Sequence, residues 1–243
     1  MLVALMDCQR AGHSAQRRPG MCERLAQFSS PVQLISTLGW HKEVRQQQPL
    51  QPRTSIAPEG AVGLVHGQSD CLVFDPVRWG WFPRWAKVKS PQFHAPVDKV
   101  THSPYWKAVW QHRALCPVDG WFEWSSRGTD LPRPHYVRRR DGQACLIAAV
   151  GQFPRTGREA TADDGFVLLV GEKRGGLVDE RGVRPLILSP EVALEWIDVS
   201  TEKGRPHEIV QAQAASDDIF EWFPVDYEAV MQETVSIQLL NNR

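Results

Sequence analysis

Short apolar runs recur along this chain, and most of them are bounded by Gly, Pro, Asp or Ser. Runs of this length are typical of β-strands. Helix signals are fewer: Ser30-Pro31, Ser103-Pro104 and Ser189-Pro190 each place a capping serine before a proline at the first helical position. We expect strands at residues 61–66, 71–74, 114–118, 135–138, 145–150, 166–170 and 186–188, and helices over 30–39, from Ser103, from Ser189 and over 207–214.

The expected strands do not alternate regularly with helices, so a parallel βαβ fold is disfavoured. The sequence predicts an α+β fold, in which a few short helices accompany a strongly curved, partly barrel-like and mainly antiparallel sheet. A chain of 243 residues can bury a large core, and no linker divides it, so we expect a single domain.

One stretch, Asp119-Gly120-Trp121-Phe122-Glu123-Trp124, sets a carboxylate among aromatic residues. An ionised carboxylate pressed against indole rings loses hydration, so its pKa rises and it can act as a general acid near neutral pH. The alternative is a core strand in which the indoles point inward and Glu123 points to solvent. Glu123 is therefore a candidate catalytic residue.

The net charge is zero, but its distribution is uneven. Residues 1–140 carry 19 Lys+Arg against 10 Asp+Glu, whereas residues 141–243 carry 9 against 18, which gives +9 and −9. Seven of the ten tryptophans lie between residues 79 and 124, within the basic part. Cations interleaved with aromatic rings suit phosphates and unstacked bases, so this part predicts binding of single-stranded nucleic acid. A solvated positive face is the alternative.

Several classes of site and location are disfavoured. The five cysteines are odd in number and form no C-x-x-C pair, which argues for a reducing cytoplasm and against a disulfide framework or a zinc site. The histidines show no metal-ligand spacing, and no glycine loop could cradle a nucleotide phosphate, so we expect no metal and no cofactor. No apolar run approaches membrane-spanning length.

Residues 1–20 stand apart from the rest of the chain. They lack the hydrophobic core of a secretory signal, and we expect a disordered leader, a removable propeptide or a mis-assigned start. Met21 would then precede the mature first residue, Cys22, which would carry a free α-amine and a thiol. Such a 1,2-aminothiol condenses with an aldehyde to an imine, which the thiol closes to a thiazolidine ring. We expect the domain over 21–235 and a tail over 236–243.

The chain resembles the SRAP family of SOS-response-associated peptidases, or abasic-site-processing proteins. The resemblance covers residues 21–230. It is carried by Met21-Cys22-Glu23-Arg24, Ser55-Ile56-Ala57-Pro58, Arg78-Trp79-Gly80-Trp81, Trp106 to Trp110, the Asp119 to Trp124 stretch, Gly176-Leu177-Val178-Asp179 and Arg184-Pro185-Leu186.

This resemblance implies a function in the DNA damage response. The family shields abasic sites in single-stranded DNA by a covalent thiazolidine with its N-terminal cysteine, and is credited with autoproteolytic removal of the preceding residues. By resemblance Cys22 is the nucleophile and Glu123 the acid/base that shuttles protons. The implied DNA contacts are a phosphate contact from Arg24, apolar wedges from Pro58 and Trp85, and Ser55 in place of a family asparagine. The expected partner is single-stranded DNA with abasic sites, bound by a cytoplasmic monomer that is nucleoid-associated when on DNA.

Some site positions depart from the family pattern. Glu23 replaces a glycine, and His94-Ala95-Pro96 replaces an Asn-Ala-Arg sequence that orients the reacting groups and grips phosphate. Arg181 replaces a histidine thought to open the sugar and reverse the crosslink, and arginine cannot relay a proton. His94 could supply an imidazole instead. The alternatives are a catalytically degenerate single-stranded DNA-binding module, a peptidase limited to autoprocessing before Cys22, and a structural protein without DNA.

Overall fold

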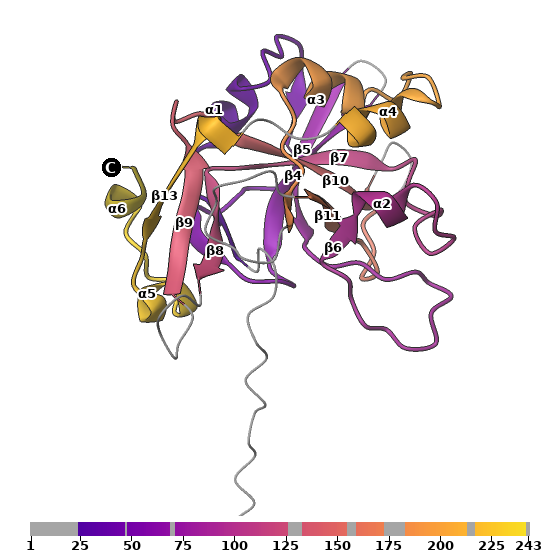
Figure 1. Ribbon diagram of the computed structural model, residues 1–243. Coiled ribbons are helices and arrows are strands. Elements are labelled where there is room, and N and C mark those ends of the chain that lie inside the picture. Colours follow the sequence, from indigo (N-terminus) through magenta and orange to yellow (C-terminus); the bar gives the residue numbers. More distant parts are fainter. Residues whose placement is uncertain are drawn as a thin grey trace, which may run out of the picture.

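The protein is described by a computed structural model that covers residues 24–46, 48–68, 71–125, 133–154, 159–172, 183–212 and 217–241. Within these residues the strands form two sheets, one of five strands and one of eight. The sheets lie against each other, and short helices cover their outer faces (Figure 1). Both sheets are curved, and neither closes into a barrel.

The smaller sheet joins strands from both ends of the described chain. Every pair in it is antiparallel. Its order is β13 (Phe220–Pro224), β9 (Arg133–Arg139), β8 (Gly120–Ser125), β1 (Arg24–Gln27) and β3 (Arg53–Ile56).

The larger sheet has the order β12 (Val183–Pro185), β11 (Gly165–Glu172), β10 (Cys145–Gln152), β7 (Arg113–Val118), β4 (Ala61–Gln68), β5 (Cys71–Arg78) and β2 (Val44–Arg45), with β6 (His94–Pro96) beside β11. It is also mainly antiparallel, with parallel pairs at β2–β5 and β6–β11. The predicted α+β class and the mainly antiparallel, curved sheet architecture are confirmed.

The hydrophobic core has three parts, separated by the sheets. The central core lies between the sheets and combines Leu25, Trp121 and Val137 of the smaller sheet with residues such as Cys116 and Leu168 of the larger. A second part packs the larger sheet under the helices α1 (Pro31–Ser36), α2 (Val97–Val100), α3 (Pro190–Ile197) and α4 (Arg205–Ala212). A third packs the smaller sheet under α5 (Tyr227–Met231) and α6 (Ile237–Asn241), which follow a 3-10 turn over Asp217–Ile219.

The chain passes directly from the larger sheet to the smaller at Asp119, between β7 and β8. The Asp119 carboxylate accepts hydrogen bonds from the backbone N–H groups of Phe28 (2.7 Å) and Ser29 (3.0 Å), and from the Ser29 hydroxyl. The buried amide of Gln27 bridges the two sheets by bonding Gly63 and Pro117. These contacts fix β1, the first described strand, against β8.

Most predicted elements are present. The hairpin of β4 and β5, the strands β7, β9, β10 and β11, and the helices α1 and α3 are found where the sequence predicts them. Ser30 caps α1 with a full capping box to Gln33, and Gly39 ends that region with φ +62°. The helix predicted over 207–214 is α4, which begins earlier, and its last two predicted residues lie outside the described ones.

Two predictions of secondary structure are wrong. The segment after Ser103 is a series of turns rather than an α-helix, held by bonds such as Trp106 N–H to the Ser103 carbonyl (3.1 Å). The turns let Trp106 and Trp110 both enter the core, while Tyr105 meets Trp81 edge-on. The strand predicted at 186–188 lies earlier, as β12, and Ile187 forms only an isolated bridge.

Candidate active site

Glu123 lies inside the protein rather than facing solvent. Its side chain is on the same face of β8 as Trp121, toward the central core, because side chains alternate along a strand. Only 3% of the residue is exposed, and the Trp121 indole N–H donates a 3.0 Å hydrogen bond to Oε1. The indole therefore orients the carboxylate while neighbouring rings restrict its hydration, as the aromatic sequence around it predicts.

A buried arginine from the other sheet accompanies this carboxylate. Arg184, on β12, is 3% exposed, and its guanidinium lies 5.7 Å from the centre of the Phe220 ring. That ring meets the Trp121 ring edge-on at 5.3 Å. Burial lowers the pKa of Arg184, and the negative charge of Glu123 opposes that lowering. The site thus contains a buried cation and a buried anion on opposite sheets.

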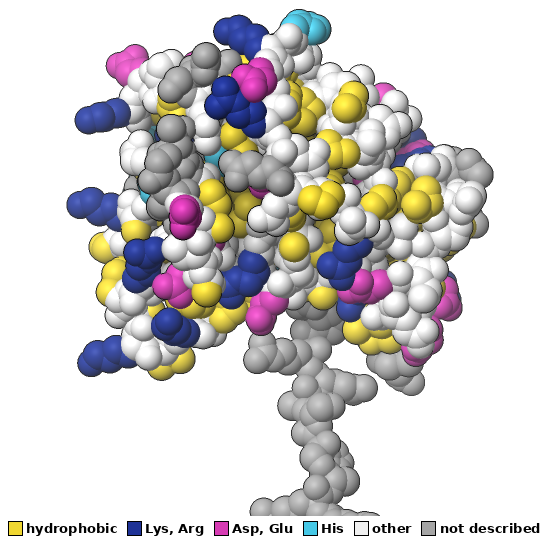
Figure 2. All heavy atoms as spheres, turned by 180° about the vertical axis from the view of Figure 1, so that it is seen from behind, with side chains coloured by type: hydrophobic (Ala, Val, Ile, Leu, Met, Phe, Trp, Pro, Cys, Tyr) yellow, Lys and Arg dark blue, Asp and Glu magenta, His cyan; other side chains and the backbone are white. Residues whose placement is uncertain are grey.

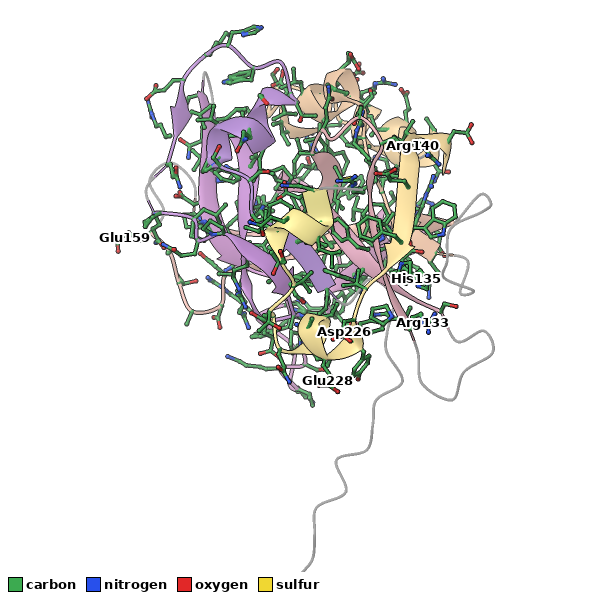
Figure 3. The ribbon with its side chains drawn as sticks, turned by 90° about the vertical axis from the view of Figure 1, so that its left-hand side faces the viewer. Arg133, His135, Arg140, Glu159, Asp226 and Glu228 are labelled. Carbon is green, nitrogen blue, oxygen red and sulfur yellow. The ribbon has the colours of Figure 1, made fainter. Side chains whose placement is uncertain are left out.

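A histidine lies beside Glu123 on the neighbouring strand. His135 of β9 is the direct cross-strand partner of Glu123, so the two side chains share one face of the sheet. The His135 Nδ1 lies 3.2 Å from the Arg133 carbonyl oxygen. Burial lowers the pKa of His135 and favours its neutral form. Figure 3 shows Arg133 and His135 together at one end of β9, with Arg140 at the other.

Sequence reasoning missed both Arg184 and His135 as neighbours of Glu123. Arg184 is distant in sequence and reaches Glu123 only because the two sheets pack face to face. The pairing of His135 depends on the register between β8 and β9. A period-two pattern predicts each strand, but it does not set which residues face each other across the hairpin.

Arg24 and Ser55 lie on the other face of the smaller sheet. Arg24 pairs with Phe122, so its side chain is on the face opposite Glu123. Its Nη1 donates to the Ser55 hydroxyl (3.0 Å), which in turn donates to the Val230 carbonyl (2.8 Å). Arg24 also forms an ion pair with Glu233 (3.6 Å). Both residues are buried under the C-terminal helices in this structure.

His94 and Pro58 border the central core on the side of the larger sheet. The half-buried His94 ring meets the buried Trp79 ring edge-on at 5.7 Å. Pro58 is half-buried in the turn after β3, and the next residue, Glu59, has φ +71° and bonds the Trp79 carbonyl through its N–H (2.7 Å). Both predicted site residues are thus near Trp79, His94 through its ring and Pro58 through the backbone of the residue that follows it.

Trp85 differs from the other tryptophans of the basic part. It is 66% exposed and meets the Tyr105 ring in a T-shaped contact at 5.9 Å, whereas the six others between residues 79 and 124 are buried. The exposed cations Arg84, Lys87 and Lys89 flank it. Figure 2 shows basic and hydrophobic side chains beside each other along this margin of the molecule. The aromatic cluster is therefore mostly core, with one ring at the surface.

Arg113 and the three described cysteines have structural rather than catalytic environments. Arg113 is buried and donates to the carbonyl groups of Trp196 (2.7 Å) and Asp198 (3.1 Å). Cys71, Cys116 and Cys145 are buried, and burial raises the pKa of Cys145 to about 12 and that of Cys116 still further. These two thiols therefore stay protonated and inert near neutral pH.

Two predicted site residues, Cys22 and Arg181, lie outside the described residues. Among the residues that the structure describes, no three His, Cys, Asp or Glu side chains converge as metal ligands. Within the same residues, no helix has the length and apolar character needed to cross a membrane.

Comparisons with known proteins place the chain among relatives of similar length. The family model described as SOS response associated peptidase (SRAP) matches residues 21–232. The abasic site processing protein YedK of Escherichia coli (strain K12) is 36% identical over 211 residues, which cover 84% of this chain and 92% of YedK.

Solved structures share the fold. A phage-related protein of Bordetella bronchiseptica has a TM-score of 0.70 at 29% identity, over 84% of this chain and 94% of that one. A protein from Bacteroides thetaiotaomicron has a TM-score of 0.71 at 14% identity, over 91% of this chain and 100% of that one, and supports the fold alone.

Proposed function

The chain belongs to the SOS response associated peptidase (SRAP) family, and from this premise we propose that it processes abasic sites in DNA. The substrate that we propose is an abasic site in single-stranded DNA, captured as a covalent crosslink. The protein acts in the cytoplasm as a monomer and becomes associated with the nucleoid when it binds DNA.

The proposed reaction needs Cys22 as the first residue of the mature chain, so residues 1–21 must be absent or be removed by autoproteolysis. The α-amine of Cys22 attacks the aldehyde carbon of the ring-opened sugar, and loss of water gives an imine. The thiol sulfur then bonds to the imine carbon as its S–H bond breaks and gives up its proton, and the C=N electron pair moves to nitrogen, which carries a proton in the product. An aldehyde and an aminothiol thus become one thiazolidine and one water.

The buried carboxylate of Glu123 is the observation that carries this proposal. β1 begins at Arg24, whose partner on β8 is Phe122, the residue next to Glu123. Cys22 precedes Arg24 by two residues, and two residues span at most about 7 Å. The amine of Cys22 is thus within chain reach of the carboxylate. A carboxylate at this place suits the proton transfers of imine formation.

Trp85 and its basic neighbours suit the DNA strand. A large exposed ring can stack on an unpaired base, and Arg84, Lys87 and Lys89 can neutralise phosphates. Pro58 lies in a turn and offers a second apolar surface. For Arg24 and Ser55 we propose contacts with DNA that require their bonds to the C-terminal segment to rearrange, because both are buried as they stand.

Two positions that differ from the family pattern, His94 and Arg181, have proposed roles in the same reaction. We propose that His94, beside Trp79, hydrogen-bonds the reacting sugar. Arg181 would hold a phosphate or an oxyanion, since arginine stays protonated. A site built this way forms the crosslink but reverses it slowly, because a permanent cation cannot return a proton to the leaving amine.

A crosslinking assay tests the proposed function. Protein that begins at Cys22 is incubated with a single-stranded oligonucleotide carrying an abasic site, and the products are separated under denaturing conditions. We expect a shifted covalent band. The matched oligonucleotide carries a tetrahydrofuran analogue without an aldehyde, and should bind without a covalent band.

The same assay separates the proposal from its alternatives. Binding of both oligonucleotides without a covalent band would indicate a DNA-binding module and contradict the proposed chemistry. Cys22→Ala should abolish the covalent band, because the nucleophile is gone, but should spare non-covalent DNA binding. That binding should weaken with added salt, because phosphate contacts release counterions. A band that survives this substitution would mean that a different nucleophile reacts.

A further inference from the structure

Arg184 is a buried cation at the Glu123 carboxylate that the proposed reaction leaves without a role. Its guanidinium and the carboxylate both belong to residues that are 3% exposed. The Phe220 ring lies 5.7 Å from the guanidinium and 5.3 Å from the Trp121 ring, whose N–H bonds Glu123. Isolated buried charges are costly, and two opposite charges in one enclosure favour each other's ionised form.

Three groups on β8, β9 and β1 adjoin Glu123 or its strand, and none of them brings a positive charge to its face of the sheet at neutral pH. From β8 itself, the Trp121 indole donates a neutral hydrogen bond. From β9, His135 shares the face of Glu123, but burial lowers its pKa and favours the neutral ring. From β1, Arg24 lies on the opposite face of the sheet. Arg184, by contrast, interacts electrostatically with this carboxylate.

We propose that Arg184 is a positioning residue that keeps Glu123 ionised, so that Glu123 enters the reaction as a proton acceptor rather than a proton donor. This inference rests on the proposed function. It reverses what burial among indoles alone predicts, since burial favours the neutral acid whereas a neighbouring guanidinium favours the carboxylate. The orientation set by Trp121 is compatible with either form.

The proton balance follows from this starting state. The α-amine of Cys22 is partly protonated near neutral pH, and the Glu123 carboxylate takes one proton from it. The free amine bonds to the aldehyde carbon, and the proton that nitrogen sheds goes to the oxygen. Glu123 then returns its proton to that hydroxyl, which leaves as water while the nitrogen lone pair forms C=N. Thiol attack on the iminium releases one proton to solvent.

The experiment titrates Glu123 directly. Carbon-13 NMR of protein with carboxyl-labelled glutamate follows each carboxyl against pH, and Glu123→Gln identifies the Glu123 signal. In the unchanged protein we expect Glu123 to titrate below neutral pH, so that it is ionised at the pH of the reaction. In Arg184→Met the midpoint of this titration should rise by about 1–3 pH units. In Arg184→Lys, which keeps the charge, it should rise less.

Arg113→Met is the matched control. Arg113 is also buried, and its guanidinium also lies 5.7 Å from an aromatic ring, that of Trp196, but it bonds backbone carbonyl groups away from Glu123. Its loss should leave the Glu123 midpoint unchanged. The acidic limb of the pH–rate profile for crosslinking should move with the midpoint in Arg184→Met and stay in place in Arg113→Met.

The outcomes separate this inference from the proposed function. An unchanged Glu123 midpoint in Arg184→Met, or a Glu123 that is protonated at neutral pH in the unchanged protein, overturns the role of Arg184 even if the crosslink forms. If Arg184→Met does not fold, the midpoints of the unchanged protein and of Arg184→Lys decide. Absence of any crosslink contradicts the proposed function and the proton transfer, while the titration still decides whether Arg184 holds Glu123 ionised.

Discussion

At the scale of single residues, burial and pairing act in opposite directions on Glu123. Its aromatic neighbours exclude water, which favours the protonated acid, while Arg184 favours the carboxylate. The Trp121 N–H fixes one oxygen at 3.0 Å. A carboxyl group that is buried, oriented and close to a cation needs little reorganisation to move a proton, which is the property that acid/base catalysis requires.

Replacing this carboxyl should therefore slow the reaction strongly. Glu123→Gln keeps the shape and a hydrogen-bond acceptor for Trp121 but cannot carry the proton, so the crosslinking rate should fall by about 10²–10⁴-fold. Single-turnover rates with abasic single-stranded DNA check this. Glu228→Gln makes the same change on the exposed face of α5 and should leave the rate alone. Equal rates in the two variants would remove Glu123 from the mechanism.

His135 gives a prediction for the pH dependence of stability. Burial lowers its pKa in the folded protein, so the unfolded chain binds the proton more tightly. The stability that neutral His135 contributes is complete above its pKa in the unfolded chain, which is about 6.5. It declines as the pH falls from there toward the pKa of His135 in the folded protein. Denaturant unfolding of His135→Gln should show a flatter pH profile below about 6.5 than the unchanged protein. His41→Gln, at an exposed histidine, is the control and should leave the pH dependence of the free energy of unfolding as it is in the unchanged protein. The same pH dependence in His135→Gln would contradict this account.

At the scale of elements, β1 is a short strand held in place by its own polar side chains and by Asp119. It has four residues, too few to be stable alone. Asp119 clamps the backbone that follows it, Gln27 ties it to the larger sheet, and Arg24 ties it to β3 and the C-terminal helices. This anchoring fixes the point from which the chain leads back to Cys22, so the position of the proposed nucleophile depends on it.

Loss of the Asp119 clamp should loosen this strand. In Asp119→Ala the backbone N–H groups of Phe28 and Ser29 lose their acceptor, which should cost about 1–3 kcal/mol in the free energy of unfolding. Urea denaturation measures the loss, and amide hydrogen exchange should show faster opening of β1 than of β10. Asp98→Ala, on an exposed residue of α2, is the comparison. Equal stability of the two variants would show that the clamp contributes little.

At the scale of the whole molecule, the sequence predicts the fold class and the elements with strong local signals. The β4–β5 hairpin and α1 carry clear apolar patterns or caps. The strands β1 and β3 are short and rich in polar residues, so only their partners across the sheet define them. The segment after Ser103 has the signal of a helix start, but burial of Trp106 and Trp110 overrides it.

The candidate site also has a part that the sequence predicts and a part that depends on how distant segments pack. Glu123 is predictable because its aromatic neighbours are adjacent in sequence. Its approach to Arg184 results from the packing of two sheets, and no local pattern encodes it. The buried positions of Arg24 and Ser55 likewise depend on the C-terminal segment, far away along the chain.

The most direct test of the central claim is the mass of the linked peptide. The protein is incubated with an abasic oligonucleotide, digested with protease and nuclease, and examined by mass spectrometry without borohydride reduction. We predict a peptide that begins at Cys22 and carries the sugar remnant with the loss of one water, stable because a thiazolidine needs no reduction. A remnant on a lysine, a linked peptide that still contains Met1, or a linkage that survives only after reduction would contradict the account.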